Sequence, residues 1–237
     1  MSGKDLHWHM PPSKERALYL SKRELATLVF DAVNLEGINV TLPEVQTLLE
    51  GVTIGGHTLS DQQVVLNQKN AYNLLFELVK ENRFRLDKQT FCHIHEQAGY
   101  QDALAWGEFR KDDVRIAGTD YRPPKFSQLE DCFKKMIVEA EKLEDIYDKA
   151  IYVFLWTARN QFFYDVNKRT GRLMMNGILL NAGYPAINLQ ASHKLEFNTL
   201  MLDFYNTGDV TSMNKFLRSC LKEDHIKFMK SGRDKHC

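Results

Sequence analysis

Four side chains of the types that bind phosphates and metal ions lie within eight residues of this chain, at the predicted start of a helix. They are Asp165, Asn167, Arg169 and Arg172. The N-terminus of a helix has N–H groups without intrahelical partners and the positive end of the helix dipole, so it attracts anions. Because Arg169 and Arg172 are three residues apart, they lie on one face of such a helix. The spacing indicates a site for a bound polyphosphate.

Asp165 adds a ligand for a divalent cation. Mg²⁺ in nucleotide sites is usually held by one or two carboxylates together with phosphate oxygens, and paired guanidinium groups form forked hydrogen bonds to the same phosphates. This combination is typical of phosphoryl or nucleotidyl transfer, in which the protein mainly positions groups and neutralises charge. The alternative from spacing alone is a surface helix with two arginines and a nearby aspartate, which is common in proteins of many functions.

Helical periodicity surrounds this run on both sides. Apolar residues recur every three to four positions in nine segments, which are residues 13–33, 41–49, 60–80, 87–99, 129–143, 146–158, 170–181, 195–205 and 213–225. Thr41 and Glu44 predict a capping box, and Ser60 with Asp61 predicts a second helix start. Residues 107–124 interrupt the pattern, and the β-type triplet 114–116 between turn residues predicts a small hairpin or flap. We therefore expect an all-α protein with one small β-hairpin.

Bulk composition narrows the choice of partners and compartment. The 31 basic residues equal the 31 acidic ones, so no net field favours nucleic acid or an anionic membrane. The cysteines are far apart and form no C-x-x-C pair, which favours reduced thiols; they are Cys92, Cys132, Cys220 and Cys237. Residues 1–12 do not resemble a signal peptide, and no apolar run reaches membrane-spanning length. We expect a cytoplasmic protein with no nucleic-acid or membrane partner, and the sequence leaves a homo-oligomer open.

His93 and His95 are two residues apart, so a helix directs them to different sides. That spacing differs from the i,i+4 pair of a zinc-binding helix. We therefore expect His95 to be a packed core histidine and not a metal ligand.

The run from Gln161 to Arg172 resembles the signature of the Fic (filamentation induced by cAMP)/Fido family, H-x-F-x-[D/E]-G-N-[G/K]-R-x-x-R. The matching positions are Phe163, Asp165, Asn167, Lys168, Arg169 and Arg172. Residues 106–124, 173–185 and 206–217 are also similar to segments of that family, so the resemblance covers roughly residues 15 to 222. It implies the Fic helical fold with a small β-hairpin flap, and transfer of AMP from ATP, with Mg²⁺, to a Ser, Thr or Tyr hydroxyl of a target protein.

The resemblance also implies a role for each matching position. Asp165 would bind the metal, Arg169 the α/β-phosphate region and Arg172 the γ-phosphate. The complete nucleotide-binding set would be Val166, Asn167, Lys168, Arg169, Gly171 and Arg172. The flap would dock the target polypeptide through its main chain, and it comprises Val114, Arg115, Ile116, Ala117 and Gly118.

Residues 32–38 resemble the inhibitory [S/T]-x-x-x-E-[G/N] helix that some family members have before the core. Glu36 would then pair with Arg172 and occupy the partner of the γ-phosphate. Ala32 departs from the pattern, because Ser or Thr is usual there. The alternative is an ordinary helix end with an acid and a glycine. On this interpretation the chain has a tail at 1–12, N-terminal helices at 13–100 that share one domain with a Fic core at 101–225, and a C-terminal tail at 226–237.

The active-site motif itself is degenerate. Gln161 occupies the position of the catalytic histidine, and an amide has no basic pKa with which to accept a proton. Val166 and Lys168 replace the two glycines of G-N-G, which stiffens the loop. Three functions remain open: a weakened adenylyltransferase, an inactive nucleotide- or protein-binding pseudoenzyme, and a phosphotransferase like the death-on-curing toxins. Arg172 argues against the last, because those toxins lack the second arginine.

Overall fold

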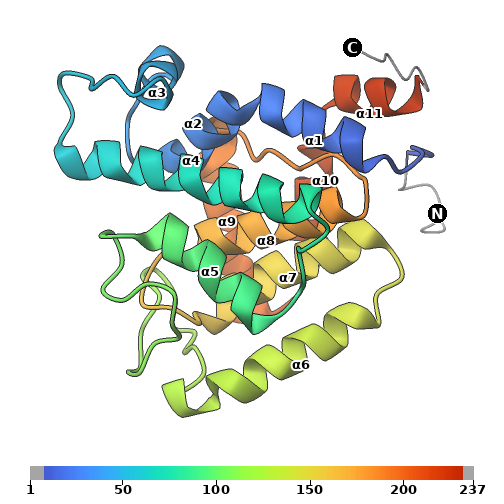
Figure 1. Ribbon diagram of the computed structural model, residues 1–237. Coiled ribbons are helices and arrows are strands. Elements are labelled where there is room, and N and C mark those ends of the chain that lie inside the picture. Colours follow the sequence, from blue (N-terminus) through green and yellow to red (C-terminus); the bar gives the residue numbers. More distant parts are fainter. Residues whose placement is uncertain (1–7, 232–237) are drawn as a thin grey trace.

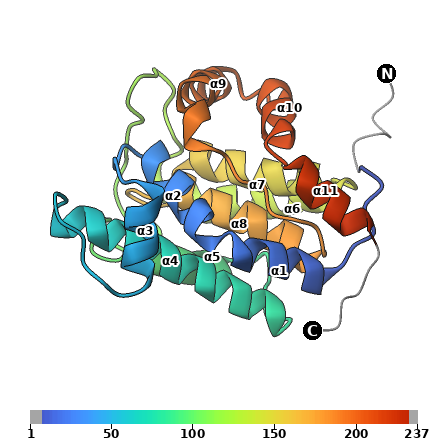
Figure 2. The same cartoon turned by 90° about the horizontal axis from the view of Figure 1, so that it is seen from above.

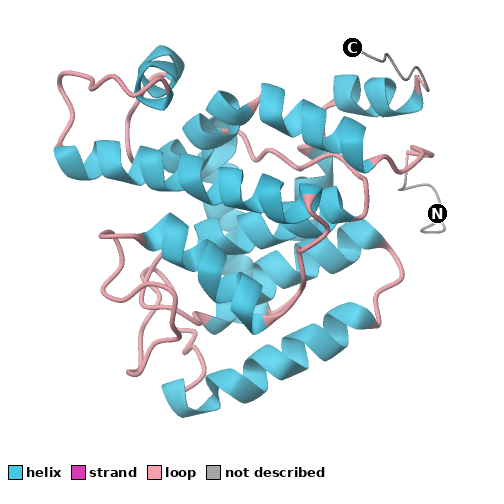
Figure 3. Cartoon of the chain, in the orientation of Figure 1, coloured by secondary structure: helices cyan, strands magenta, loops and turns pink. Residues whose placement is uncertain are grey.

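The computed structural model describes residues 8–231, and this part of the chain is helical with irregular connections (Figures 1 and 3). The α-helices are α1 (Lys14–Arg23), α2 (Leu25–Leu35), α3 (Leu42–Leu49), α4 (Leu59–Lys80), α5 (Lys88–Gly99), α6 (Leu129–Glu141), α7 (Ile146–Asn160), α8 (Asn167–Asn181), α9 (Lys194–Thr207), α10 (Thr211–Ser219) and α11 (Glu223–Lys230). Two short 3₁₀ helices, η1 (Phe126–Gln128) and η2 (Ala191–His193), precede α6 and α9. The expectation of an all-α fold is confirmed.

The predicted β-hairpin is wrong. Between residues 8 and 231 no strand forms, and residues 107–124 are an irregular loop (Figure 3). A two-stranded hairpin is marginally stable in water unless a third strand or a packed face supports it. The triplet 114–116 has no such support, since no segment pairs with it.

Local side-chain chemistry determines where the helices begin. Thr41 and Glu44 form the expected capping box at the start of α3. The N-cap of α4 is Thr58 and not the predicted Ser60, because the Thr58 hydroxyl accepts the N–H of Asp61 at 3.0 Å. The single helix expected over 13–33 is two helices, α1 and α2, which meet at Glu24. The helix expected over 213–225 is likewise divided, into α10 and α11.

Helix α8 lies at the centre of the molecule, with α7 alongside it in both views (Figures 1 and 2). Almost every residue from Asn167 to Leu180 is buried. Gly171 permits the close approach of α7, since a Cβ atom there would lie only 2.9 Å from Cδ2 of Phe154 and 3.0 Å from its carbonyl oxygen. Helices α1, α4 and α5 cover the other sides of α8. The N-terminus of α8 is therefore held firmly by its neighbours.

The N-terminal helices share one hydrophobic core with the rest of the chain. Helix α11 packs beside α1, where Glu24 binds Lys222 at 2.7 Å and His225 at 3.1 Å. Met229 is fully buried, so residues 226–230 belong to the folded body and not to a tail. Of the expected tail at 1–12, residues 1–7 lie outside the described part, as do residues 232–237, whereas Met10 is buried. No helix among residues 8–231 has the length and apolar character needed to cross a membrane.

Candidate functional site

The loop between α7 and α8 and the first two turns of α8 contain the residues predicted from sequence to bind phosphate. Gln161 and Val166 bracket this loop, and both have left-handed backbone conformations, with φ of 50° and 61°. A β-branched residue is disfavoured there and stores about 1–3 kcal/mol of strain. Burial of Phe162, Phe163 and Val166 holds the loop in this shape. A glycine at position 166 would adopt the same backbone conformation without this strain.

Asn167 is the internal brace of the loop. Its Oδ1 accepts the N–H of Phe163 at 3.0 Å, and its Nδ2 donates to the carbonyl oxygen of Phe163 at 2.8 Å. The same Nδ2 donates to Oε1 of Gln161 at 3.0 Å. These bonds occupy the amide, so the groups of Asn167 that remain for a phosphate are in its main chain. Val166, the N-cap residue of α8, has no polar side chain, and no side-chain cap forms there within residues 8–231.

Gln161 is bound into the same network. Its Nε2 donates to the carbonyl oxygen of Ala158 at 2.6 Å, while its Oε1 accepts from Asn167. Both ends of the amide are thus engaged within the protein. Gln161 links the end of α7 to the loop and has no basic pKa with which to act as a general base.

His95 supports the loop from α5. Its ring stacks on Phe163 with 3.6 Å between centroids, Nδ1 accepts the N–H of Gly107 at 3.1 Å, and Nε2 lies 3.3 Å from the carbonyl oxygen of Asp165. These partners assign the proton to Nε2. Burial lowers the pKa of His95 from 6.5 to about 4, so the ring is neutral at pH 7. His95 is the expected packed core histidine, and both its ring nitrogens have partners.

Arg172 contacts the carboxylate of Glu36, as the resemblance to the inhibitory helix implies. Its Nη2 donates to Oε1 of Glu36 at 3.1 Å and to the carbonyl oxygen of Ala32 at 3.3 Å. Lys168 binds the other carboxylate oxygen of Glu36 at 3.0 Å. Burial would raise the pKa of Glu36, but the charges of Arg172, Lys168 and Arg169 outweigh burial and hold the pKa below its ordinary value.

Arg169 has an acidic partner that sequence reasoning missed. Its Nη2 lies 2.7 Å from Oδ2 of Asp102, which follows α5. The pair is separated by 67 residues, so no local pattern relates them. Nε and Nη1 of Arg169 and Nη1 of Arg172 are buried without a hydrogen-bond partner in the described part of the chain. Each such donor costs about 1–3 kcal/mol, so this cluster of donors fits an acceptor with several oxygens.

Asp165 is exposed at the mouth of the loop, where its Oδ1 accepts the N–H of Val166 at 2.6 Å. In the chain from residue 8 to 231 no group of three His, Cys, Asp or Glu side chains could enclose a metal ion. A single exposed carboxylate with a second oxygen suits Mg²⁺, which keeps most of its water and takes phosphate oxygens as ligands.

Arg110 anchors residues 107–124, the loop that replaces the expected hairpin. It is buried, and its guanidinium donates to the carbonyl oxygens of Gln161 and Asp112 at 2.6 Å and of Pro124. Its own N–H donates to the carbonyl oxygen of Phe162 at 2.9 Å. Arg110 therefore joins the loop to the motif through hydrogen bonds to both. Arg110 lies in a segment that is similar to the Fic family, but its sequence context gave no indication of this anchoring role.

The predicted docking segment, residues 114–118, lies within this anchored loop. Val114 and Ile116 are half-buried, whereas Arg115 and Ala117 are exposed. None of its main-chain N–H or C=O groups has a hydrogen-bond partner among residues 8–231. Exposure of the side chains thus alternates along residues 114–117, as it does in an extended strand, and the main-chain groups of the segment are available for pairing.

The geometry agrees with comparisons to known proteins. Residues 85–179 match the model of the Fic/DOC family. Protein adenylyltransferase Fic from Aedes aegypti is 26% identical over 197 residues, which cover 81% of this chain and 39% of that protein. The chain thus spans about two fifths of the length of this curated relative.

Two solved structures share the fold. Fic-1 from C. elegans superposes with a TM-score of 0.79 at 16% identity, covering 95% of this chain and 69% of that one. A Fic domain containing signaling protein from Bacteroides thetaiotaomicron gives 0.76 at 18% identity, covering 95% of this chain and 93% of that one. Fold and motif together define a Fic-type domain. That domain includes residues 85–179, the part of the chain that matches the Fic/DOC family model.

Proposed function

We propose that this chain is an ATP- and Mg²⁺-dependent protein adenylyltransferase, inhibited by Glu36 and weakened by Gln161. The observation that carries the proposal is a cluster of buried guanidinium nitrogens on Arg169 and Arg172. Among residues 8–231 these nitrogens have no hydrogen-bond partner, and the nearby start of α8 has no side-chain cap. These donors and the helix dipole together favour a polyphosphate. The name of the Aedes aegypti relative supports the same reaction.

In this reaction a target hydroxyl oxygen forms a bond to the α-phosphorus of ATP, the bond to the β-phosphate oxygen breaks, and pyrophosphate leaves. Arg169, Arg172 and the first N–H groups of α8 would hold the phosphates, and Asp165 would hold Mg²⁺, which offsets their charge. The hydroxyl proton needs an acceptor. Gln161 is not one, so transfer by this chain would be about 10²- to 10⁴-fold slower than with a positioned base.

Glu36 would inhibit by holding the donors that the γ-phosphate needs. Arg172 and Lys168 both bind its carboxylate, at 3.1 and 3.0 Å. An incoming triphosphate would have to displace this carboxylate or bind beside it, against its negative charge. Removal of Glu36 would therefore strengthen productive binding.

The target would dock on residues 114–118. Their unpaired main-chain groups and alternating exposure support strand-like pairing with an extended peptide, which would add its main-chain bonds to an edge. Arg110 would fix this edge relative to the motif loop, because it binds Gln161 and Pro124. A cytoplasmic location and a homo-oligomer stay predictions.

The second candidate function is a pseudoenzyme that binds nucleotide or protein without chemistry. The observation in its favour is the engagement of both ends of the Gln161 amide within the loop. Calorimetry with ATP and Mg²⁺ separates the two functions: binding without turnover in the unmodified chain favours the pseudoenzyme, and turnover excludes it.

The deciding experiment follows radioactive ATP into the proteins of a lysate. Four chains are compared: the unmodified protein, Glu36→Gly, Gln161→His and the double variant. We expect the most label from α-labelled ATP with the double variant, and loss of that label when Arg172→Ala is added. Absence of label in all four refutes the proposed activity. Label from the γ-phosphate alone would instead identify a phosphotransferase like the death-on-curing toxins.

A further inference from the structure

We propose that Asp102 is a second acidic competitor for the phosphate site, one that holds Arg169 and acts separately from Glu36. This inference rests on the proposed nucleotide binding and concerns its regulation. It gives the chain two carboxylates, from different elements, on the two arginines of one site.

The geometry separates the two acids. Glu36 follows α2 and binds Arg172 and Lys168, whereas Asp102 follows α5 and binds Arg169 at 2.7 Å. The backbone of Asp102 is held by a bond from its N–H to the carbonyl oxygen of Gly99 at 3.1 Å. Removal of Glu36 therefore leaves the Asp102–Arg169 pair in place.

The charges indicate competition. Arg169 is buried, with 7% of its side chain exposed, and the carboxylate of Asp102 forms an ion pair with one of its terminal nitrogens, Nη2. A carboxylate at this distance offsets the positive charge that attracts a phosphate and repels the phosphate itself. Nε and Nη1 of Arg169 have no hydrogen-bond partner in the part of the chain that the structure describes, so Asp102 satisfies the guanidinium only in part. A polyphosphate with many acceptor oxygens could replace the carboxylate and satisfy the remaining donors.

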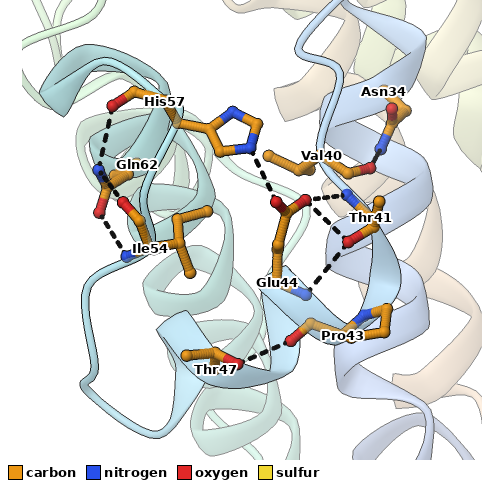
Figure 4. A network of polar contacts seen from close by, with 9 residues as sticks. All are labelled: Asn34, Val40, Thr41, Pro43, Glu44, Thr47, Ile54, His57 and Gln62. Atoms are coloured by element: carbon orange, nitrogen blue, oxygen red, sulfur yellow. Dashed lines mark hydrogen bonds and ion pairs between the residues drawn. The ribbon is translucent and has the colours of Figure 1, made fainter.

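A cavity next to Asp102 could accept its carboxylate if a phosphate displaced it from Arg169. It borders a cavity of about 560 Å³ between the end of α3, the loop after it and the first turns of α4. Gln62 in the wall of this cavity clamps the loop, as its amide accepts from the N–H of Ile54 at 3.3 Å and donates to the carbonyl oxygen of Ile54 at 3.2 Å (Figure 4). Glu44 binds His57 at 3.2 Å in the same network (Figure 4). A displaced Asp102 carboxylate would enter a preformed, partly polar space and regain water there.

The sign of one measurement decides between a competitor and a support. If Asp102 competes, Asp102→Asn tightens binding, because the amide keeps the shape and removes the charge. If Asp102 only orients Arg169, the same change weakens binding. The ligand series ATP, ADP, AMP and adenosine, with Mg²⁺, adds a second criterion, since charge competition affects the polyphosphates and leaves adenosine unchanged.

The experiment is calorimetric titration of the full chain and its Asp102→Asn, Glu36→Gly and double variants. We expect Asp102→Asn to raise ATP affinity roughly ten-fold, to leave adenosine affinity unchanged, and to have this effect with or without Glu36. Asp203→Asn, on the exposed face of α9, is the control for the loss of one negative charge. Asp102→Ser takes the place of the Asn variant if that variant does not fold.

Two outcomes overturn the inference. Unchanged or weaker ATP binding in Asp102→Asn, while Glu36→Gly still binds ATP more tightly than the unmodified chain, refutes competition by Asp102 and leaves the proposed function intact. Failure of every variant to bind ATP refutes the nucleotide site itself and the inference with it.

Discussion

Glu36 and Arg172 form an ion pair at 3.1 Å between the end of α2 and the second turn of α8, although 136 residues separate them. Arg172 also donates to the carbonyl oxygen of Ala32, in the last turn of α2. This carbonyl lacks an intrahelical partner, as the last carbonyls of any helix do. Arg172 therefore binds both the side chain of Glu36 and the end of the helix that positions it, which would couple the proposed inhibition to the packing of α2.

Glu36→Gln should lower the free energy of unfolding by about 1–3 kcal/mol at neutral pH, because Arg172 and Lys168 lose a shared charged acceptor. The pKa of Glu36 is below its ordinary 4.5, so the ionised form stabilises the folded state. That contribution is complete above about 4.5 and is lost as the pH falls through the folded-state pKa. Urea unfolding across this range measures it, with the exposed Glu50→Gln as control. A difference that grows on acidification would contradict the ion pair.

His95 should make the fold less stable as the pH falls from 6.5 to about 4. In the unfolded chain this ring binds a proton near pH 6.5, whereas burial keeps the folded ring neutral until about pH 4. Protonation therefore stabilises the unfolded state relative to the folded state over this pH range. A shift of this size is worth up to about 3 kcal/mol. His95→Gln should remove most of this slope from a urea series, and the exposed His93→Gln should keep it. Equal slopes in the two variants would refute the assignment.

The sequence predicted the parts of the site that depend on local pattern or on the family motif. The capping box at Thr41, the helical entry at Asn167 and the Glu36–Arg172 pair are present. It did not predict Asp102 beside Arg169, because that contact depends on how α5 packs against α8 and leaves no periodic signal. The prediction of a β-hairpin was wrong for a related reason. A β-type triplet forms a strand only where a partner strand exists, and tertiary context determines that.

Val166 should show a reversed preference between alanine and glycine. In a helix or strand, a glycine variant is less stable than the alanine variant by about 0.5–1 kcal/mol, because glycine has more conformational entropy in the unfolded chain. At a φ of 61° the Cβ atom is strained, so Val166→Gly should be more stable than Val166→Ala by about 1 kcal/mol. Both variants lose the buried side chain of Val166, so their difference isolates the backbone. Urea unfolding measures it, and a more stable alanine variant would show that the loop is unstrained.

Gln161→His, in a Glu36→Gly background, should raise the rate of AMP transfer by about 10²- to 10⁴-fold, because it supplies the missing proton acceptor. The increase should appear in kcat. It should grow as the pH rises through about 6.5, the ordinary pKa of histidine, because the imidazole then loses its proton and can accept one. Gln161→Ala in the same background is the control, since it removes the amide bonds to Ala158 and Asn167 without adding a base. If alanine increased transfer as much as histidine does, the amide would be blocking the site, and the absence of a base would not explain the low activity. Nucleotide affinity should stay the same in the histidine variant, because on the proposed function Arg169 and Arg172, not residue 161, bind the phosphates.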